Sequence, residues 1–158
     1  MSSPHDFDFF HGDWDVVNRR RTDFLDPDSD WEEFPATSRC RPLFDGAANI
    51  DEVDMAHLGS KGLTLRLFDR ATEQWSLNWS SSRTGKLFPP VFGRFEGERG
   101  EFHGDDVHDG KDVQVRFVWS GVSATSARWE QAFSMDGGET WLTNWTMDFT
   151  RPSGTPGA

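Results

Sequence analysis

The sequence reads Trp75-Ser76-Leu77-Asn78-Trp79-Ser80 near its middle, and bulky apolar side chains alternate there with small polar ones. A period of two is typical of a β-strand with one buried and one wet face, because successive side chains point to opposite sides of a sheet. The same pattern runs through 113–119, 129–133 and 141–149. No window keeps apolar residues at helical spacing over three turns, so we expect an all-β protein.

Turn signals such as Asp45-Gly46 and Asp109-Gly110 separate the alternating runs at strand-length intervals. Because the connections are short, consecutive strands are expected to pair as hairpins. Many such strands in a small domain favour a single antiparallel up-and-down β-barrel, which leaves no exposed edge. A two-sheet sandwich is the rival arrangement. About ten strands are predicted, near 13–23, 31–44, 47–57, 62–69, 73–81, 91–97, 100–107, 111–119, 126–135 and 140–150.

One stretch, Ser134-Met135-Asp136-Gly137-Gly138-Glu139-Thr140-Trp141, follows the pattern Ser-x-Asp-x-Gly-x-Thr-Trp. It resembles the Asp box of sialidases and related propellers, where the Asp caps a hairpin turn. A propeller needs several blades, and this chain has one box and too few residues for them. We therefore interpret the stretch as a structural hairpin and not as a catalytic motif.

The length of 158 residues fits one domain. We expect residues 1–11 to form a short N-terminal plug at one end of the barrel and residues 12–151 to form the barrel domain. Residues 152–158, rich in Pro, Gly and Ser, are predicted to be a disordered tail.

The charge balance excludes some function classes, because 27 acidic residues face 16 basic ones and the formal net charge is -11. Such a surface repels phosphate backbones, so no nucleic-acid partner is expected. No apolar run approaches the ~18 residues of a spanning helix, so no membrane partner is expected either. The acidic and aromatic start, Met1 to Asp13, is unlike a signal peptide and favours a cytoplasmic location. A single cysteine, Cys40, forms no internal disulfide.

With the bulky faces turned inward, a ten-stranded barrel is wide enough to leave a cavity lined by aromatic rings. A few polar residues share these inward faces, and burying them without partners would cost a few kcal/mol each. We therefore predict a module that binds a small hydrophobic or aromatic molecule. The candidate ligand-binding residues are Asn18, Arg20, Trp79, Trp129, Gln131, Thr143 and Trp145.

Two other hypotheses stay open. The first is a cofactor-free isomerase, cyclase or lyase that acts on a hydrophobic metabolite by acid–base chemistry. Strand phase alone places Asp106 and Glu52 as its catalytic carboxylates, and Arg20 could stabilise a developing enolate. The second is an interaction protein whose barrel is packed solid by Trp rings and whose outer face pairs with itself. A homodimer is compatible with a small barrel, although no sequence feature shows it.

Clusters of His and Asp at 5–13 and at 103–109 contain residue types that bind metals. The cluster at 103–109 ends in an Asp-Gly turn, and alternation sends its members to both faces of a strand. We interpret both clusters as solvated segments, and we expect no metal site.

Gly12-Asp13-Trp14 opens the first predicted strand and looks like the first-strand motif of lipocalins and other calycins. In those barrels the Trp closes one end, often stacked under an Arg from near the chain end, a role that the resemblance gives to Arg151. A longer resemblance, to small bacterial calycin-like proteins without a settled activity, spans 7–16, 62–69, 128–134 and 144–151. It implies a β-barrel and leaves the function open.

Nitrobindin-like haem barrels are neighbours of this fold and begin with Gly-x-Trp-x-Gly. Here Val16 stands in place of the second Gly, and no His follows His108 to serve as the proximal ligand. No cofactor is therefore expected.

Overall fold

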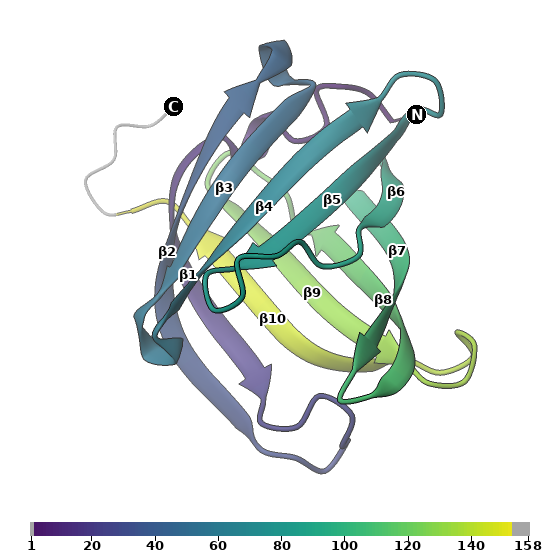
Figure 1. The fold of residues 1–158 in the computed structure, drawn as a ribbon. Helices are drawn as coiled ribbons and strands as arrows, with labels where there is room; N and C mark the ends of the chain where they lie inside the picture. The colour runs from purple at the N-terminus through teal and green to yellow at the C-terminus, as the bar shows by residue number, and fades with distance from the viewer. Residues whose placement is uncertain (1, 153–158) are drawn as a thin grey trace.

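The structure is a computed structural model that describes residues 2–152. Ten antiparallel strands in these residues form a closed barrel, in which each strand pairs with its neighbours in sequence and the first pairs with the last (Figure 1). The predicted up-and-down barrel is thus confirmed, and the sandwich is wrong. The strands are β1 (Gly12–Arg21), β2 (Trp31–Leu43), β3 (Ala48–Met55), β4 (Ser60–Asp69), β5 (Gln74–Ser81), β6 (Val91–Glu96), β7 (Arg99–His108), β8 (Lys111–Ser120), β9 (Ser126–Ser134) and β10 (Leu142–Thr150).

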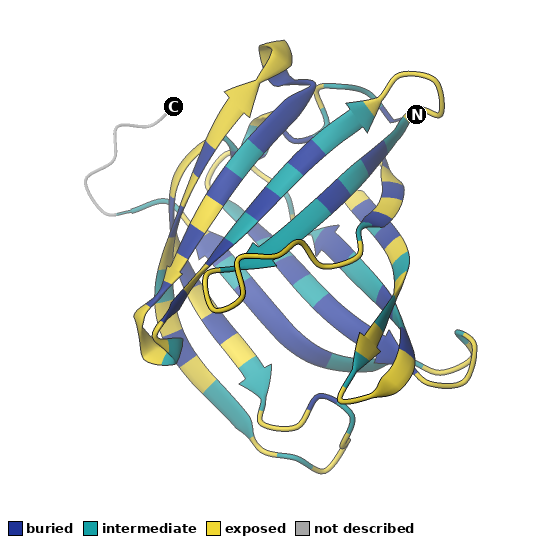
Figure 2. Cartoon of the chain, viewed as in Figure 1, coloured by how far each residue is buried: buried dark blue, intermediate teal, exposed yellow. Residues whose placement is uncertain are grey.

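Alternation of buried and exposed residues is visible as stripes along the strands (Figure 2). On β1, Trp14, Val16 and Asn18 are buried, whereas Asp15 and Val17 between them are exposed. This is the phase that the sequence predicts, because the apolar side chains lie inside the barrel. None of the helices in residues 2–152 has the length and apolar character needed to cross a membrane.

The turn between β9 and β10 is the hairpin predicted from the Asp-box pattern. The Asp136 carboxylate accepts hydrogen bonds from the Ser134 hydroxyl at 2.7 Å and from the Thr140 backbone N–H at 2.9 Å. These bonds, with that of the Thr140 hydroxyl first among them, lower the pKa of Asp136 to about 2. The motif therefore organises a turn.

Strand β10 contains a bulge that the sequence pattern does not reveal. Leu142 pairs with Phe133 and Thr143 with Ala132, but the next pair joins Trp145 to Gln131, so Asn144 is the extra residue. A bulge of one residue reverses the alternation on its far side. Thr143 consequently shares the outer face with Ala132, and its predicted inward orientation is wrong.

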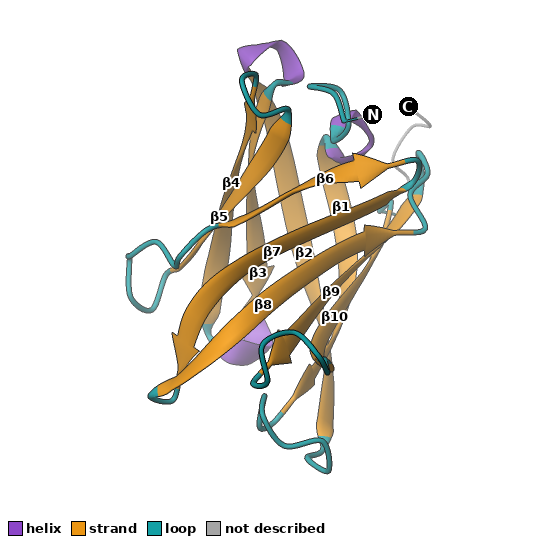
Figure 3. Ribbon diagram, turned by 90° about the vertical axis from the view of Figure 1, so that its right-hand side faces the viewer, coloured by secondary structure: helices purple, strands orange, loops and turns teal. Residues whose placement is uncertain are grey.

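One end of the barrel is closed by the segment before β1, which includes the 3-10 helix η1 (Asp8–Phe10) (Figure 3). Phe7 and Phe10 are fully buried there, with the Phe10 ring 4.8 Å from Trp119 and 5.1 Å from Phe149. This end is packed solid by aromatic rings. The tail predicted at 152–158 lies outside the described residues, except for Pro152.

Arg151 fastens the closed end, as the calycin resemblance implies. Its guanidinium carbon lies 3.7 Å from the centre of the Trp14 ring, a cation–π contact. Its N–H groups donate to the backbone carbonyls of Phe9, His11 and Asp13 at 3.0–3.1 Å and to that of Ala124 at 3.1 Å. One side chain thus joins the plug, β1 and the loop before β9.

The weakest seam of the wall lies between β5 and β6. These strands share three residue pairs, whereas β1 and β2 share ten. Beyond Leu77 the two strands separate, and the loop 82–90 crosses the gap (Figure 1). Ser80 near the end of β5 and Leu87 of this loop form an isolated bridge.

We expect Arg151→Ala to lower the free energy of unfolding by about 2 kcal/mol, because it removes several charge-assisted hydrogen bonds and the contact with Trp14. Urea denaturation followed by Trp fluorescence measures the change. Arg70→Ala is the control, since Arg70 is exposed and makes no hydrogen bond or ion pair with residues 2–152. Equal effects of the two substitutions would contradict the role given to Arg151.

Candidate ligand-binding site inside the barrel

The other half of the barrel is hollow and contains two adjoining chambers. The inner chamber, next to the plug, has a volume of about 50 Å³, and the outer chamber, at the open end, has about 280 Å³. The inner volume suits about three or four water molecules, and the outer volume is close to the lower bound of small-molecule sites. Five residues line both chambers: Leu77, Trp79, Phe117, Gln131 and Trp145.

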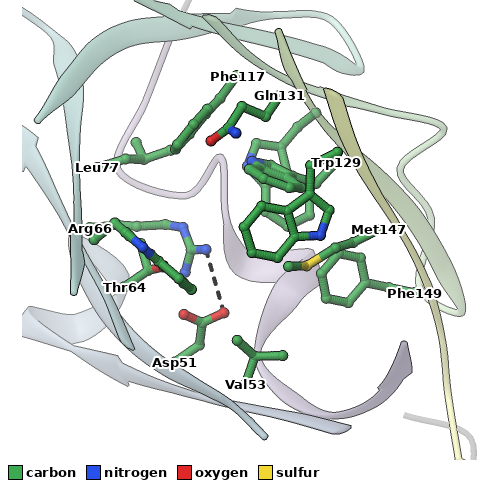
Figure 4. A pocket seen from close by; sticks show the side chains of 13 residues that line it. Asp51, Val53, Thr64, Arg66, Leu77, Phe117, Trp129, Gln131, Met147 and Phe149 are labelled. Atoms are coloured by element: carbon green, nitrogen blue, oxygen red, sulfur yellow. Dashed lines mark hydrogen bonds and ion pairs between the residues drawn. The ribbon is translucent and has the colours of Figure 1, made fainter. Parts of the chain in front are cut away.

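The inner chamber has a charged wall that the sequence analysis did not include. Arg66 of β4 is 4% exposed and donates to the Asn49 amide oxygen at 2.9 Å. It also forms an ion pair with Asp51 at 3.5 Å, and Asp51 is 6% exposed (Figure 4). The register explains this geometry, because Asn49 of β3 lies opposite Arg66 and Asp51 opposite Thr64. The two charges balance each other where water is scarce.

Strand β4 places its polar face inward, against the rule that bulky apolar side chains point to the core. Gly62, Thr64 and Arg66 are buried, while the three leucines that alternate with them, Leu63, Leu65 and Leu67, are only half-buried on the outer face. Alternation in this segment predicts a strand with two different faces. It does not say which face is inside the barrel.

Arg66 also connects the chamber to the plug. Its guanidinium lies 5.2 Å from the Phe7 ring, 5.0 Å from Phe10 and 5.6 Å from Trp119. Three buried atoms around it, Nε of Arg66, Nδ2 of Asn49 and Nε1 of Trp119, have no hydrogen-bond partner among residues 2–152. Buried donors usually find a partner, so the inner chamber is suited to water or to the polar end of a guest.

Aromatic rings form the opposite wall of the chambers. The Trp145 ring lies 5.6 Å from Trp129 and 6.3 Å from Trp79, both edge-to-face, and Phe117 lies 5.1 Å from Trp129. Gln131 is the polar group on this wall, and its Nε2 donates to Asn144 at 2.8 Å. Its Oε1 accepts no hydrogen bond from residues 2–152 and is available to a donor in the chamber (Figure 4).

The position of Trp79 depends on a glycine. A Cβ atom at Gly62 would lie 1.9 Å from Cη2 of Trp79, so the ring occupies the space that a side chain would need. Any larger residue at position 62 must displace the ring toward the chamber. Gly62 thus makes room for the Trp79 ring, which lines both chambers.

The mouth of the outer chamber carries charged side chains on an apolar rim. Arg20 and Arg83 line it together with Asp106 and His108. Phe24, from the loop between β1 and β2, stacks on the His108 ring at 5.3 Å. The outer chamber therefore combines aromatic area with groups that can bind ions.

The structure places five of the seven candidate ligand-binding residues on the chamber walls: Arg20, Trp79, Trp129, Gln131 and Trp145. Asn18 is fully buried behind Trp145 and accepts a hydrogen bond from its Nε1 at 2.9 Å, so it positions that ring. Thr143 lines neither chamber. Asn144, next to it in the bulge, is buried instead.

The two candidate carboxylates are separated. Asp106 is half-buried at the mouth, where its Oδ1 accepts the Val107 backbone N–H at 2.7 Å. Glu52 is exposed on the outer face of β3, so its predicted inward orientation is wrong by one residue. The neighbouring Asp51 holds the inward position. Alternation indicates that one of the adjacent acids Asp51 and Glu52 points inward. Because both are acidic, residue type does not show which one.

The clusters at 5–13 and 103–109 form local contacts. His5 pairs with Asp8 at 3.1 Å, and the Nε2–H of His103 donates a hydrogen bond to the Glu101 carboxylate at 2.9 Å. Among residues 2–152, no three His, Cys, Asp or Glu side chains are placed to hold one metal ion.

No family model matches the chain, and no curated protein sequence matches it.

We expect Asp51→Ala to lower the free energy of unfolding by about 3–5 kcal/mol, because it leaves the Arg66 charge buried without its carboxylate. Glu52→Ala is the matched control, since it removes the adjacent carboxylate from the outer face and should change stability by less than about 0.5 kcal/mol. Chemical denaturation measures both. A larger loss for Glu52→Ala would contradict the register of β3.

Cys40 is buried, and burial raises the pKa of its thiol to about 12. A protonated, buried thiol reacts slowly, so we expect a thiol reagent at pH 8 to label the folded chain at least about a hundredfold more slowly than the chain in urea. Because the folded pKa lies above the ordinary value of 9.0, this group stabilises the fold below pH 9.0, and the contribution is lost as pH rises toward 12. Rapid labelling of the folded chain would contradict this placement.

Proposed function

We propose that the protein binds a small, mostly apolar molecule inside the barrel. The observation that carries this proposal is the pair of adjoining chambers, which share Trp79, Phe117, Trp145 and Gln131 and open at one end. Aromatic walls with a few placed polar groups are typical of small-molecule sites. The rings supply contact area, and Gln131 and the Arg66–Asp51 pair orient the guest.

We further propose that the chain is a calycin-like binding barrel. The ten-stranded meander supports this relation, as does the contact between Trp14 at the start of β1 and Arg151 after β10. The acid–base alternative has less support, because Glu52 faces solvent and Asp51, the carboxylate in the inner chamber, is bound to Arg66. A solid barrel has less support still, given the hollow half.

The neutral fluorescent probe N-phenyl-1-naphthylamine tests the proposal. Burying roughly 250 Å² of apolar surface at ~25 cal/mol per Å² favours binding by about 6 kcal/mol, a dissociation constant on the order of 10 μM. We expect saturable binding of one probe per chain, with quenching of Trp emission as energy passes to the probe. Absence of saturable binding would contradict the proposal.

Two variants locate the probe. Gly62→Ala pushes the Trp79 ring into the chamber and should weaken binding about tenfold or more. Phe92→Ala removes a half-exposed ring from the outer face of β6 and should leave binding unchanged. Circular dichroism verifies that each variant is folded. Loss of binding in Phe92→Ala alone would place the probe on the surface and overturn the proposal.

A further inference from the structure

The guanidinium of Arg20 is held at the mouth of the outer chamber without an ion-pair partner among residues 2–152. It lies between two rings, 4.5 Å from the centre of Phe24 and 4.8 Å from that of Trp145. It makes no hydrogen bond and no ion pair with any residue in 2–152, and its Nε is buried without a partner. The two rings fix its position, while the donors on its two terminal nitrogens have no partner among residues 2–152.

Arg20 has no carboxylate partner among residues 2–152, although the chain has 27 acidic residues and only 16 basic ones. Burial lowers the pKa of Arg20, and the nearby Arg83 lowers it too, whereas Glu32 raises it. Glu32 itself is engaged with His57 at 3.2 Å. Arg20 stays protonated at neutral pH in spite of this, so its charge at the mouth is uncompensated by direct contact.

Arg83 adds a second positive charge to the same mouth. It belongs to the loop 82–90, and its Nη2 donates to the backbone carbonyl of Leu58, another residue of the outer chamber. A carbonyl satisfies one donor and leaves the charge in place. Among residues 2–152, no carboxylate forms an ion pair with Arg83 either.

The inner end of the cavity has the opposite character. Arg66 is neutralised there by Asp51 and bonded to Asn49, so that end offers polar groups without net charge. Asp106 is the carboxylate on the same rim, and among residues 2–152 it forms no ion pair with Arg20 or Arg83, so two guanidiniums face one carboxylate at the mouth. The cavity is thus polarised along its length, with a neutral inner end, an aromatic middle and a mouth with an excess of positive charge. An elongated guest with one charged end has only one favourable orientation in such a field.

We propose, on the basis of the proposed function, that the guest is an amphiphilic anion that enters with its apolar body first. Its anionic head is a carboxylate, sulfonate or phosphate, and its oxygens accept paired hydrogen bonds from the Arg20 guanidinium. Arg83 adds a second positive charge nearby. Its body packs against Trp79, Phe117 and Trp145. The head group is selected at the mouth, and the shape of the body is selected inside.

A pair of probes that differ by one charged group tests this. N-phenyl-1-naphthylamine is neutral, and 8-anilino-1-naphthalenesulfonate has the same rings with a sulfonate added. We expect the folded wild-type chain to bind the sulfonate about tenfold or more tightly than the neutral probe. Displacement of the neutral probe by decanoate compared with decanol repeats the comparison for a carboxylate head.

Substitutions at two neighbouring arginines of β1 separate a specific contact from general charge. Arg20→Met should remove the preference for the sulfonate, measured as the ratio of the dissociation constants of the two probes within the same variant. Arg20→Lys should keep part of the preference, because it keeps the charge and loses the fork. Arg19→Met is the matched control, since Arg19 is exposed on the outer face over Trp31, and it should preserve the preference.

The outcomes distinguish binding inside the barrel from selection of an anionic head by Arg20. If neither probe binds, the proposed function fails and this inference fails with it. If the neutral probe binds but the sulfonate binds no more tightly, only this inference is overturned. It is also overturned if Arg20→Met, shown by circular dichroism to be folded, leaves the preference intact, or if Arg19→Met removes it equally.

Discussion

The ion pair between Arg66 and Asp51 is the constraint around which the interior is arranged. A guanidinium that is 4% exposed needs a partner of opposite charge, since an isolated charge in this environment would cost several kcal/mol. Asp51 and Asn49 supply the partners, and both must then point inward from β3. The pairing of β3 with β4 consequently turns the three leucines of β4 outward and leaves polar groups in place of apolar bulk inside.

The interior is divided between two roles. The plug and the closed end, with Phe10, Trp14 and Trp119, form a packed aromatic core that is fastened by Arg151. The open half holds the chambers. Arg66 lies at the boundary, where its guanidinium contacts the rings of the core on one side and the inner chamber on the other. The packed core and the chambers therefore occupy different halves of the same barrel.

Most of the fold could be predicted from the sequence, and the site only in part. Alternation and turn residues predict the ends of every strand to within a few residues, because a strand with one buried and one wet face alternates apolar and polar residues. The same rule turns Arg20, Trp79, Trp129, Gln131 and Trp145 inward, and the structure places them on the chamber walls. The rule assigns the bulky face to the interior, and it therefore fails where the polar face is the buried one, as on β4.

The side-chain orientations that alternation fails to predict lie on β3, β4 and β10, and each has a physical cause. On β4 the charged face is inside, so Arg66 was missed, and on β3 two adjacent acids made Glu52 and Asp51 indistinguishable by type. On β10 the bulge at Asn144 interrupts a run that reads as perfect alternation, which sent Thr143 to the wrong face. A bulge depends on the pairing with the neighbouring strand, and a single strand's sequence does not contain that pairing.

The short seam between β5 and β6 has a consequence for kinetics. Three residue pairs hold these strands together, and the loop that bridges their separation carries Arg83, Phe88 and Pro89 of the outer chamber. Segments with few backbone hydrogen bonds open at a lower free energy than the remainder of a fold. Under the proposed function, the guest exchanges with solvent by a local opening of this seam, while the other nine strand pairings keep the barrel intact.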